Sequence, residues 1–151
     1  MPAYTSYQAS FTPSVSQDNY TLEANDAGDK ALVKWVSWGG RLTVSTSYQT
    51  RWVRPTTAGS STFTALATEN ANPRYSPLCR VGTFATAPSL PSAPDALHLQ
   101  DWNAHGGVGL IVLPLGAEWE IINGLLTNQL SCRNGVGTDA NGSSYGISWE
   151  E

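Results

Sequence analysis

The feature that most constrains the fold is a strict two-residue alternation of side-chain types. It is clearest between residues 41 and 52, where one set alternates with a more polar set: Leu42, Val44, Thr46, Tyr48, Thr50 and Trp52 against Arg41, Thr43, Ser45, Ser47, Gln49 and Arg51. Successive side chains of a β-strand point to opposite faces, so this period predicts a strand with one face in a core. No stretch of the chain gives a convincing helical stripe, which would need a repeat near 3.6 residues.

The same alternation recurs and predicts about eight to ten short strands joined by turns, which is typical of an all-β fold. Residues 32–38 end at Gly39-Gly40, which predicts a tight hairpin back into residues 41–52. Further strands are expected at residues 107–113, 117–123, 125–133 and 145–149, with turns at Pro114-Leu115-Gly116 and Asn123-Gly124. The 151 residues fit one domain, and we expect a single β-sandwich or jelly roll over residues 1–151.

For two segments the sequence does not decide between alternative structures. Residues 1–19 form either an extended arm that reaches a neighbouring subunit or the first strand of the sheet. Residues 72–95 contain Pro73, Pro77, Pro88, Pro91 and Pro94. Proline cannot donate to a sheet ladder, so we expect an ordered excursion over the sandwich, with an edge strand at 80–86.

Charge is scarce on this chain. Charged residues make up 13% of the sequence, against roughly 25% in an ordinary soluble domain. Such a surface repels neighbours weakly and suits packing against other copies, although it also fits an ordinary β-domain surface. The net charge of −4 and only two lysines argue against direct nucleic-acid binding. The chain begins without the features of a secretion signal, and no apolar run approaches the ~18 residues that span a bilayer, so we expect no membrane partner.

The six tryptophans and the scattered arginines supply the candidate interface and ligand residues. Trp35, Trp52, Trp119 and Trp149 lie in alternating strands and are expected in the core. Trp38 and Trp102 lie by loops and are better candidates for an interface or a ligand, with a core position as the alternative. Arg51 and Arg54 join them, because arginine suits fixed bidentate pairing at interfaces.

Residues 98–107 form the densest polar cluster and contain both histidines. His98, Asp101 and His105 carry ligand atoms that suit a metal, but no known ligand spacing is matched, so we expect no metal and no cofactor. The alternative is a strand end and turn, in which Asp101 and Asn103 cap backbone N–H groups. Asn103 and His105 also stand as interface or ligand candidates.

No set of residues predicts catalysis, and we expect a protein that is not an enzyme. Glu118 and Glu120 lie about 7 Å apart by strand rise, a spacing used in sugar hydrolysis, but a solvated or salt-bridged face is the simpler interpretation. Cys79 and Cys132 match no metal motif and are either a disulfide or, as we expect, two buried thiols.

Three segments resemble small all-β virion structural proteins of tailed bacteriophages. They are Thr-Arg-Trp-Val-Arg-Pro-Thr-Thr-Ala-Gly at 50–59, Asp-Trp-Asn-Ala-His-Gly-Gly at 101–107 and Ser-Ser-Tyr-Gly-Ile-Ser-Trp-Glu-Glu at 143–151. The resemblance implies a jelly roll or related sandwich that works as a cement (decoration) protein on the capsid. It implies a virion location after synthesis in the host cytoplasm, with the major capsid protein or another virion protein as partner. It assigns no functional residue.

Three functional hypotheses follow. The first is a homo-oligomer, favoured as a trimer, that binds and stabilises a phage head lattice. The second is a glycan- or receptor-binding module of a phage tail or fibre, in which Trp38 and Trp102 stack on sugars while Asn103 and Asp101 bind hydroxyls. The third is an enzyme of the cupin type, which needs several histidines on facing strands, and the chain has two.

Overall fold

The computed structural model describes residues 1–15, 18–26, 28–57, 60–70, 74–86, 89, 96–122 and 129–151. Within these ranges the chain forms twelve β-strands and no helix, which confirms the all-β prediction. A helix long and apolar enough to cross a membrane is accordingly absent from the described residues.

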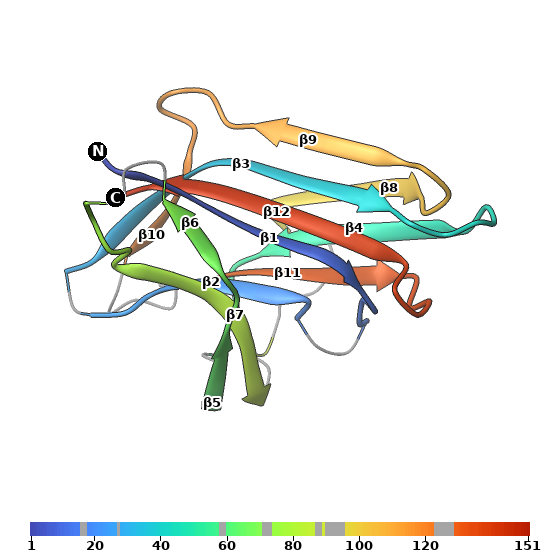
Figure 1. Cartoon of the computed structure of the whole chain (residues 1–151), viewed down its shortest axis with the longest axis horizontal. Helices are drawn as coiled ribbons and strands as arrows, with labels where there is room; N and C mark the ends of the chain where they lie inside the picture. Colours follow the sequence, from blue (N-terminus) through green and yellow to red (C-terminus); the bar gives the residue numbers. More distant parts are fainter. Residues whose placement is uncertain are drawn as a thin grey trace.

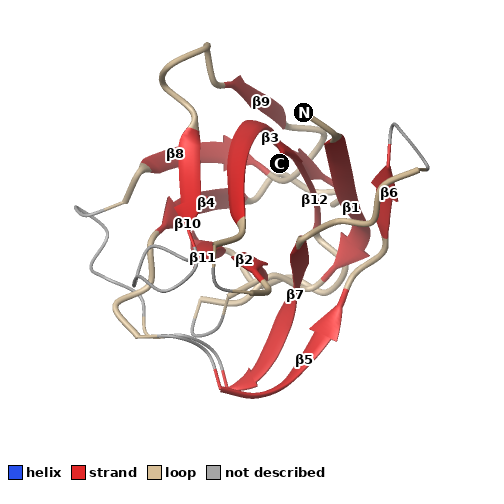
Figure 2. Cartoon of the chain, turned by 90° about the vertical axis from the view of Figure 1, so that its left-hand side faces the viewer, coloured by secondary structure: helices blue, strands red, loops and turns tan. Residues whose placement is uncertain are grey.

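The strands form two antiparallel sheets that pack face to face as a sandwich (Figures 1 and 2). Sheet A has the order β10 (Trp119–Ile122), β3 (Lys30–Gly40), β12 (Ser143–Glu150), β1 (Ala3–Phe11) and β6 (Thr68–Asn70), and β9 (Val108–Val112) also pairs with β3. Sheet B has the order β5 (Ser60–Ala65), β7 (Cys79–Thr86), β2 (Tyr20–Ala24), β11 (Gln129–Val136), β4 (Ser47–Val53) and β8 (His98–Asn103).

The core between the sheets is built on large aromatic side chains. Trp52 and Tyr20 from sheet B and Tyr145 from sheet A are fully buried. Their rings meet edge to face, with centroids 5.4 Å apart for Tyr20–Trp52 and 6.0 Å for Tyr20–Tyr145. Such pairs add about 0.5–1.5 kcal/mol each beyond the area they bury. The alternation at Tyr48, Thr50 and Trp52 therefore places these side chains in the core, as predicted.

A chain of buried hydrogen bonds crosses the interior and joins both sheets. The Tyr145 hydroxyl donates to Asn134 Oδ1 at 2.7 Å and lies 2.6 Å from Thr50 Oγ1. Trp102 Nε1 donates to the same Thr50 Oγ1 at 2.9 Å, and Asn19 Nδ2 donates to Asn134 Oδ1 at 3.0 Å. Buried polar groups are costly when unpaired, so this network holds strands β12, β11, β4 and β8 in one relative position.

The prediction of a hairpin at Gly39-Gly40 is wrong. Strand β3 continues through both glycines in sheet A, and β4 lies in sheet B, so residues 41–46 cross between the layers. Gly40 is needed for close approach instead of a turn, because a Cβ there would collide with the backbone of Ala104. The alternation from 42 to 46 belongs to this connection, whose residues pair with Ala104 through Leu42 N–H and Thr46 C=O.

The N-terminal residues form a strand within the sandwich. Strand β1 pairs with β12 on one side and β6 on the other, and Tyr4 is buried with its ring stacked 5.8 Å from that of Trp149. Of the two alternatives for this segment, the structure therefore gives the first strand for residues 3–11 and not an arm. An aromatic side chain at Tyr4 fixes the segment in the core.

Residues 79–86 form a strand, as predicted, but not at a sheet edge. Strand β7 pairs with β2 and with β5, so it is interior in sheet B. Its residues carry no proline, and Pro73, Pro88, Pro91 and Pro94 lie outside the described residues. Cys79 in this strand and Cys132 in β11 are free and buried, and burial raises the pKa of both thiols, in agreement with the expectation of two buried thiols.

The two adjacent glycines of β3 allow a matched test of the close approach between Gly40 and the backbone of Ala104. We expect Gly40→Ala to lower the free energy of unfolding by about 1–3 kcal/mol, because the new methyl group meets rigid backbone. Gly39→Ala is the control, since its Cβ would meet the Ser144 hydroxyl at 2.9 Å, a side-chain contact that can adjust. Urea unfolding of both variants measures the difference, and equal losses would contradict the assignment.

Candidate binding cleft beside strand β9

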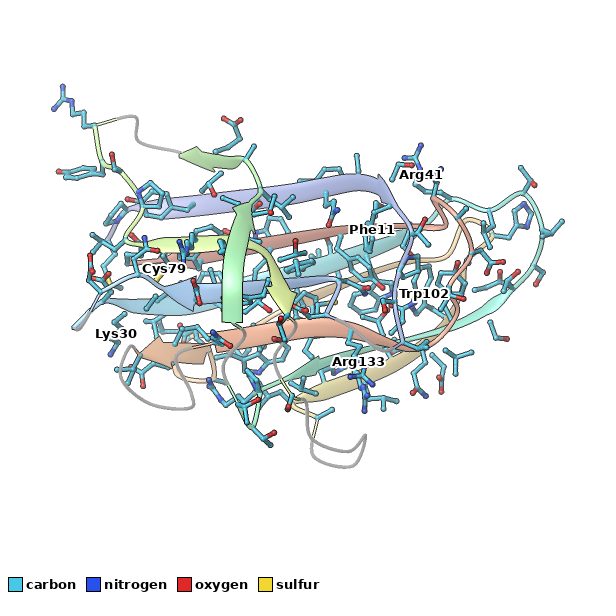
Figure 3. The ribbon with its side chains drawn as sticks, turned by 90° about the horizontal axis from the view of Figure 1, so that it is seen from below. Phe11, Lys30, Arg41, Cys79, Trp102 and Arg133 are labelled. Atoms are coloured by element: carbon cyan, nitrogen blue, oxygen red, sulfur yellow. The ribbon has the colours of Figure 1, made fainter. Side chains whose placement is uncertain are left out.

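A cleft of about 370 Å³ lies between β8, an edge of sheet B, and β9, an edge of sheet A. It is lined by Trp38, His98, Gln100, Asp101, Trp102 and residues 108–111. Trp102 lies toward the end of the sandwich opposite to Cys79 (Figure 3). The cleft brings together the two tryptophans that the sequence singled out for an interface or a ligand.

Trp38 reaches the cleft because its neighbour across the ladder is a glycine. Gly109 is opposite Trp38 in the pairing of β9 with β3, and a Cβ on Gly109 would collide with the indole ring. Trp38 lies inside β3, is only 7% exposed and belongs to the core cluster, so the core alternative is the correct one for this residue and its expected position beside a loop is wrong. Its Nε1 is buried and has no hydrogen-bond partner among the described residues.

Of the two tryptophans that line the cleft, Trp102 is the one whose indole N–H is hydrogen-bonded. Its Nε1 is bonded to Thr50, and its ring packs edge-on against Tyr48 with centroids 5.2 Å apart. The polar edge of the indole is thus satisfied in the interior, while the half-buried ring remains at the cleft. This arrangement leaves the aromatic surface, rather than the N–H, to contact a bound group.

The polar side chains of the cleft come from β8. The ring of His98 lies 6.3 Å from that of Trp38, and its Nε2 is buried without a partner among the described residues. Burial lowers the pKa of His98 below its ordinary value, which favours the neutral imidazole. Gln100 and Asp101 are exposed, and Asp101 Oδ1 accepts a hydrogen bond of 2.9 Å from Gln49 Nε2.

Asn103 is the last residue of β8, His105 lies in the turn that follows, and neither lines the cleft. Asn103 Oδ1 accepts the backbone N–H of His105 at 2.8 Å, and Asn103 Nδ2 donates to Ser45 Oγ at 2.6 Å. The capping role considered from the sequence therefore holds for Asn103. Asp101, the other residue considered for capping, bonds the Gln49 side chain instead.

The structure places Arg51 and Arg54 away from the cleft. Arg51 is buried on β4 directly opposite Arg133 of β11, and the nearby positive charge of Arg51 adds to the burial that lowers the pKa of Arg133. Arg54 is half-buried, and burial lowers the pKa of its guanidinium against an opposing effect of Glu120.

Strand β9 is the feature that sequence reasoning missed. Val108, Leu110 and Val112 are 83%, 63% and 66% exposed, although the apolar run at 107–113 predicted only a strand. Alternate residues of the same strand face inward, with Ile111 packed against the core. The signal available in the sequence was the alternation of these three aliphatic residues with Gly109, which cannot fill a core.

The acidic residues near this side are held in ion pairs. Lys34 Nζ lies 3.0 Å from both Glu118 and Glu150, and Lys30 pairs with Glu120. The salt-bridged interpretation of Glu118 and Glu120 is therefore the one that the geometry supports. Within the described ranges, no group of three or more His, Cys, Asp or Glu side chains is arranged to hold a metal ion. Comparison with protein-family models and with curated proteins gives no match to this sequence.

The half-buried imidazole of His98 makes a pH-dependent contribution to stability. Because the folded-state pKa of His98 is lowered, the unfolded chain binds more protons between that pKa and the ordinary value near 6.5. The contribution is therefore complete above about pH 6.5 and is lost as the pH falls through the folded-state pKa. We expect His98→Gln to reduce the loss of stability between pH 7.5 and pH 5, measured by urea unfolding.

A neighbouring residue of β8 supplies the control for this experiment. Leu99→Gln changes an exposed side chain that has no titratable group and should leave the difference between the two pH values as in the parent chain. An NMR titration of the His98 ring gives an independent measurement. A His98 pKa at or above the ordinary value would contradict the assignment.

Proposed function

We propose that the chain is a non-enzymatic structural protein of a virion, most simply a cement (decoration) protein that docks on the major capsid protein or another repeated virion subunit. The observation that carries this proposal is the outer face of sheet A. This face is defined here by the outward side chains of β9, β3, β12 and β1: Val108, Leu110, Val112, Trp35, Ser37, Ser144, Gly146, Ser148, Thr5 and Tyr7. It combines exposed apolar side chains with a low, flat centre.

The apolar groups lie on both sides of the centre of this face. Val108, Leu110 and Val112 follow β9, and Tyr7 on β1 is 57% exposed. A Cβ on Gly146 of β12 would come within 3.2 Å of both Trp35 and Tyr7, so the two rings approach each other across the glycine. Isolated exposed apolar residues are ordinary, but a contiguous group indicates a surface that binds a partner.

The centre of the face is flat because its residues are small. Ser144, Gly146 and Ser148 occupy the outward positions of β12, and Ser37 and Gly39 occupy those of the neighbouring strand. The nearest charges stand at the margins, where Lys34 pairs with Glu150 and Glu69 lies on the edge strand β6. Such a face loses little hydration energy when another protein covers it.

Repetition makes a modest contact sufficient for a lattice-binding protein. A stable pairwise interface buries on the order of 800 Å² per partner, and apolar burial contributes about 25 cal/mol per Å² before the costs of association. A protein that contacts several lattice subunits at once gains from their high effective concentration. The stiff sandwich and its weakly charged surface favour this mode of binding.

Mass spectrometry of particles purified from the source of the chain tests the proposal. We expect the chain in a copy number that scales with the major capsid protein. Tyr7→Lys should lower its binding to particles stripped of the chain at least tenfold in a co-sedimentation assay, because it places a charge on the outer face of sheet A. Val44→Lys is the control, since Val44 is 64% exposed outside this face. Absence of the chain, or only a few copies per particle, would contradict a lattice role.

A second candidate function is favoured by the cleft itself. The half-buried ring of Trp102 offers an aromatic platform, and the exposed Gln100, which shares its face of β8, offers an amide group beside it. Stacking of a sugar ring on an aromatic face with polar groups at its rim is a common mode of carbohydrate binding. The chain would then act as a glycan-binding module of a tail or fibre.

This alternative predicts that saccharide binding depends on the ring at position 102. Trp102→Ala should abolish binding on a glycan array, whereas Trp102→Phe should retain it, because phenylalanine keeps an aromatic face without the bond to Thr50. Circular dichroism verifies that both variants fold. Absence of any saccharide that binds the parent chain, or equal binding by the alanine variant, would contradict the glycan function.

A further inference from the structure

We infer that two copies of the chain form a dimer in which their β9 strands pair antiparallel about a two-fold axis, so that sheet A continues from one copy into the next. The inference goes beyond the proposed function and does not depend on it. It follows from the backbone, the side chains and the register of β9.

Strand β9 pairs with β3 along one edge, and no other described strand pairs with its second edge. Gly40 N–H donates to Gly107 C=O at 2.7 Å, and Leu113 N–H donates to Lys34 C=O at 2.8 Å, so residues 107 and 113 direct these groups toward β3. Backbone groups alternate in direction along an antiparallel strand. Residues 108, 110 and 112 therefore direct their N–H and C=O groups away from β3, toward the free edge.

This edge lacks the devices that protect other edges. Natural sheet edges are protected by charged side chains, proline, bulges or very short strands. Strand β6, at the opposite edge of sheet A, has three residues and carries Glu69, and β8 carries Asp101. Strand β9 reads Val-Gly-Leu-Ile-Val, with no charge and no proline, and it lies at the margin of the molecule (Figure 1).

A two-fold axis through Leu110 aligns the whole strand with its copy. Leu110 then lies opposite Leu110 of the second copy, and Val108 lies opposite its Val112. These are the residues whose backbone groups point to the free edge, so each pair can exchange two hydrogen bonds. Since every outward pair is aliphatic, the strand is complementary to itself.

The residues of β9 that face the core also pair across the axis in this register. The same register places Ile111 of the second copy opposite Gly109, the residue whose missing side chain gives the Trp38 ring room to lie against β9. An isoleucine side chain there lies beside the part of the cleft that Trp38 and Gly109 line.

The dimer is closed, because each copy uses its single β9 edge. This geometry gives a dimer and not the trimer that the sequence analysis favoured. An axis perpendicular to the sheet keeps both outer faces on the same side of the joined sheet. Val108, Leu110 and Val112 of the two copies then form one apolar group at the seam, which would enlarge the surface offered to a lattice.

Light scattering and sedimentation equilibrium of the isolated chain test the inference. We expect twice the monomer mass for the parent chain. Leu110→Lys should halve that mass, because it places two like charges directly opposite each other at the axis. The side chain is 63% exposed in one copy, so the variant should fold. Leu115→Lys is the control, since Leu115 is 93% exposed in the following turn and should leave the mass unchanged.

Cysteine cross-linking under diamide tests the register. Directly opposed residues of a hydrogen-bonded antiparallel pair have Cα atoms about 5.5 Å apart, within the range of a disulfide. Leu110→Cys should therefore cross-link as a single substitution. Val108→Cys alone should not, whereas Val108→Cys combined with Val112→Cys should. The two native cysteines are buried and should not react.

The outcomes separate this inference from the proposed function. A monomer at 100 µM, a trimer, or a dimer that survives Leu110→Lys overturns the β9 pairing. So does cross-linking by Val108→Cys alone in place of Leu110→Cys. A dimer with the expected cross-links stands even if the chain is absent from particles, and a lattice protein that is monomeric in solution retains the proposed function without the dimer.

Discussion

The interior hydrogen-bond chain from Trp102 through Thr50 and Tyr145 to Asn134 is the interaction on which the rest of the structure depends. Aliphatic side chains alone would allow the two sheets to slide, since apolar contacts have little directionality. The network has fixed distances, and a displacement of one sheet would leave buried polar groups unpaired. It also sets the orientation of Trp102, because the indole N–H must reach Thr50. The geometry of the cleft is therefore a consequence of the packing between the sheets.

Much of the fold could be predicted from the sequence because the signal is local. The alternation at Tyr48, Thr50 and Trp52 reports directly which side chains are buried, and it did so correctly. Assignment of strands to sheets is not local. Gly39-Gly40 has the composition of a hairpin turn, yet Gly40 serves a close approach of Ala104, which is distant in the sequence. Likewise, proline content indicated an edge near residues 80–86, whereas β7 lies between two other strands.

The site was predictable in part for the same reason. Trp38 and Trp102 stood out as large aromatic residues, and the structure places both at one cleft. Nothing in the spacing of the two residues shows that β3 and β8 belong to different sheets whose edges open on the same side. Arg51 and Arg54 were chosen for the chemistry of the guanidinium group alone, and that chemistry does not report burial. Arg51 is in fact covered and faces Arg133.

The role of β9 follows from the exposure of aliphatic side chains, which are ordinarily buried. An aliphatic strand that is buried needs no further explanation, but β9 exposes three aliphatic side chains and turns the backbone groups of the same residues to its free edge. In a chain with so few charged residues, surface charges cannot keep such an edge apart from its copies. Gly109 connects the strand to the cleft, because its missing side chain gives the Trp38 ring room to lie against β9 and to line the cleft. The exposure of β9 and the cleft beside it are therefore best understood together, as two parts of one binding surface.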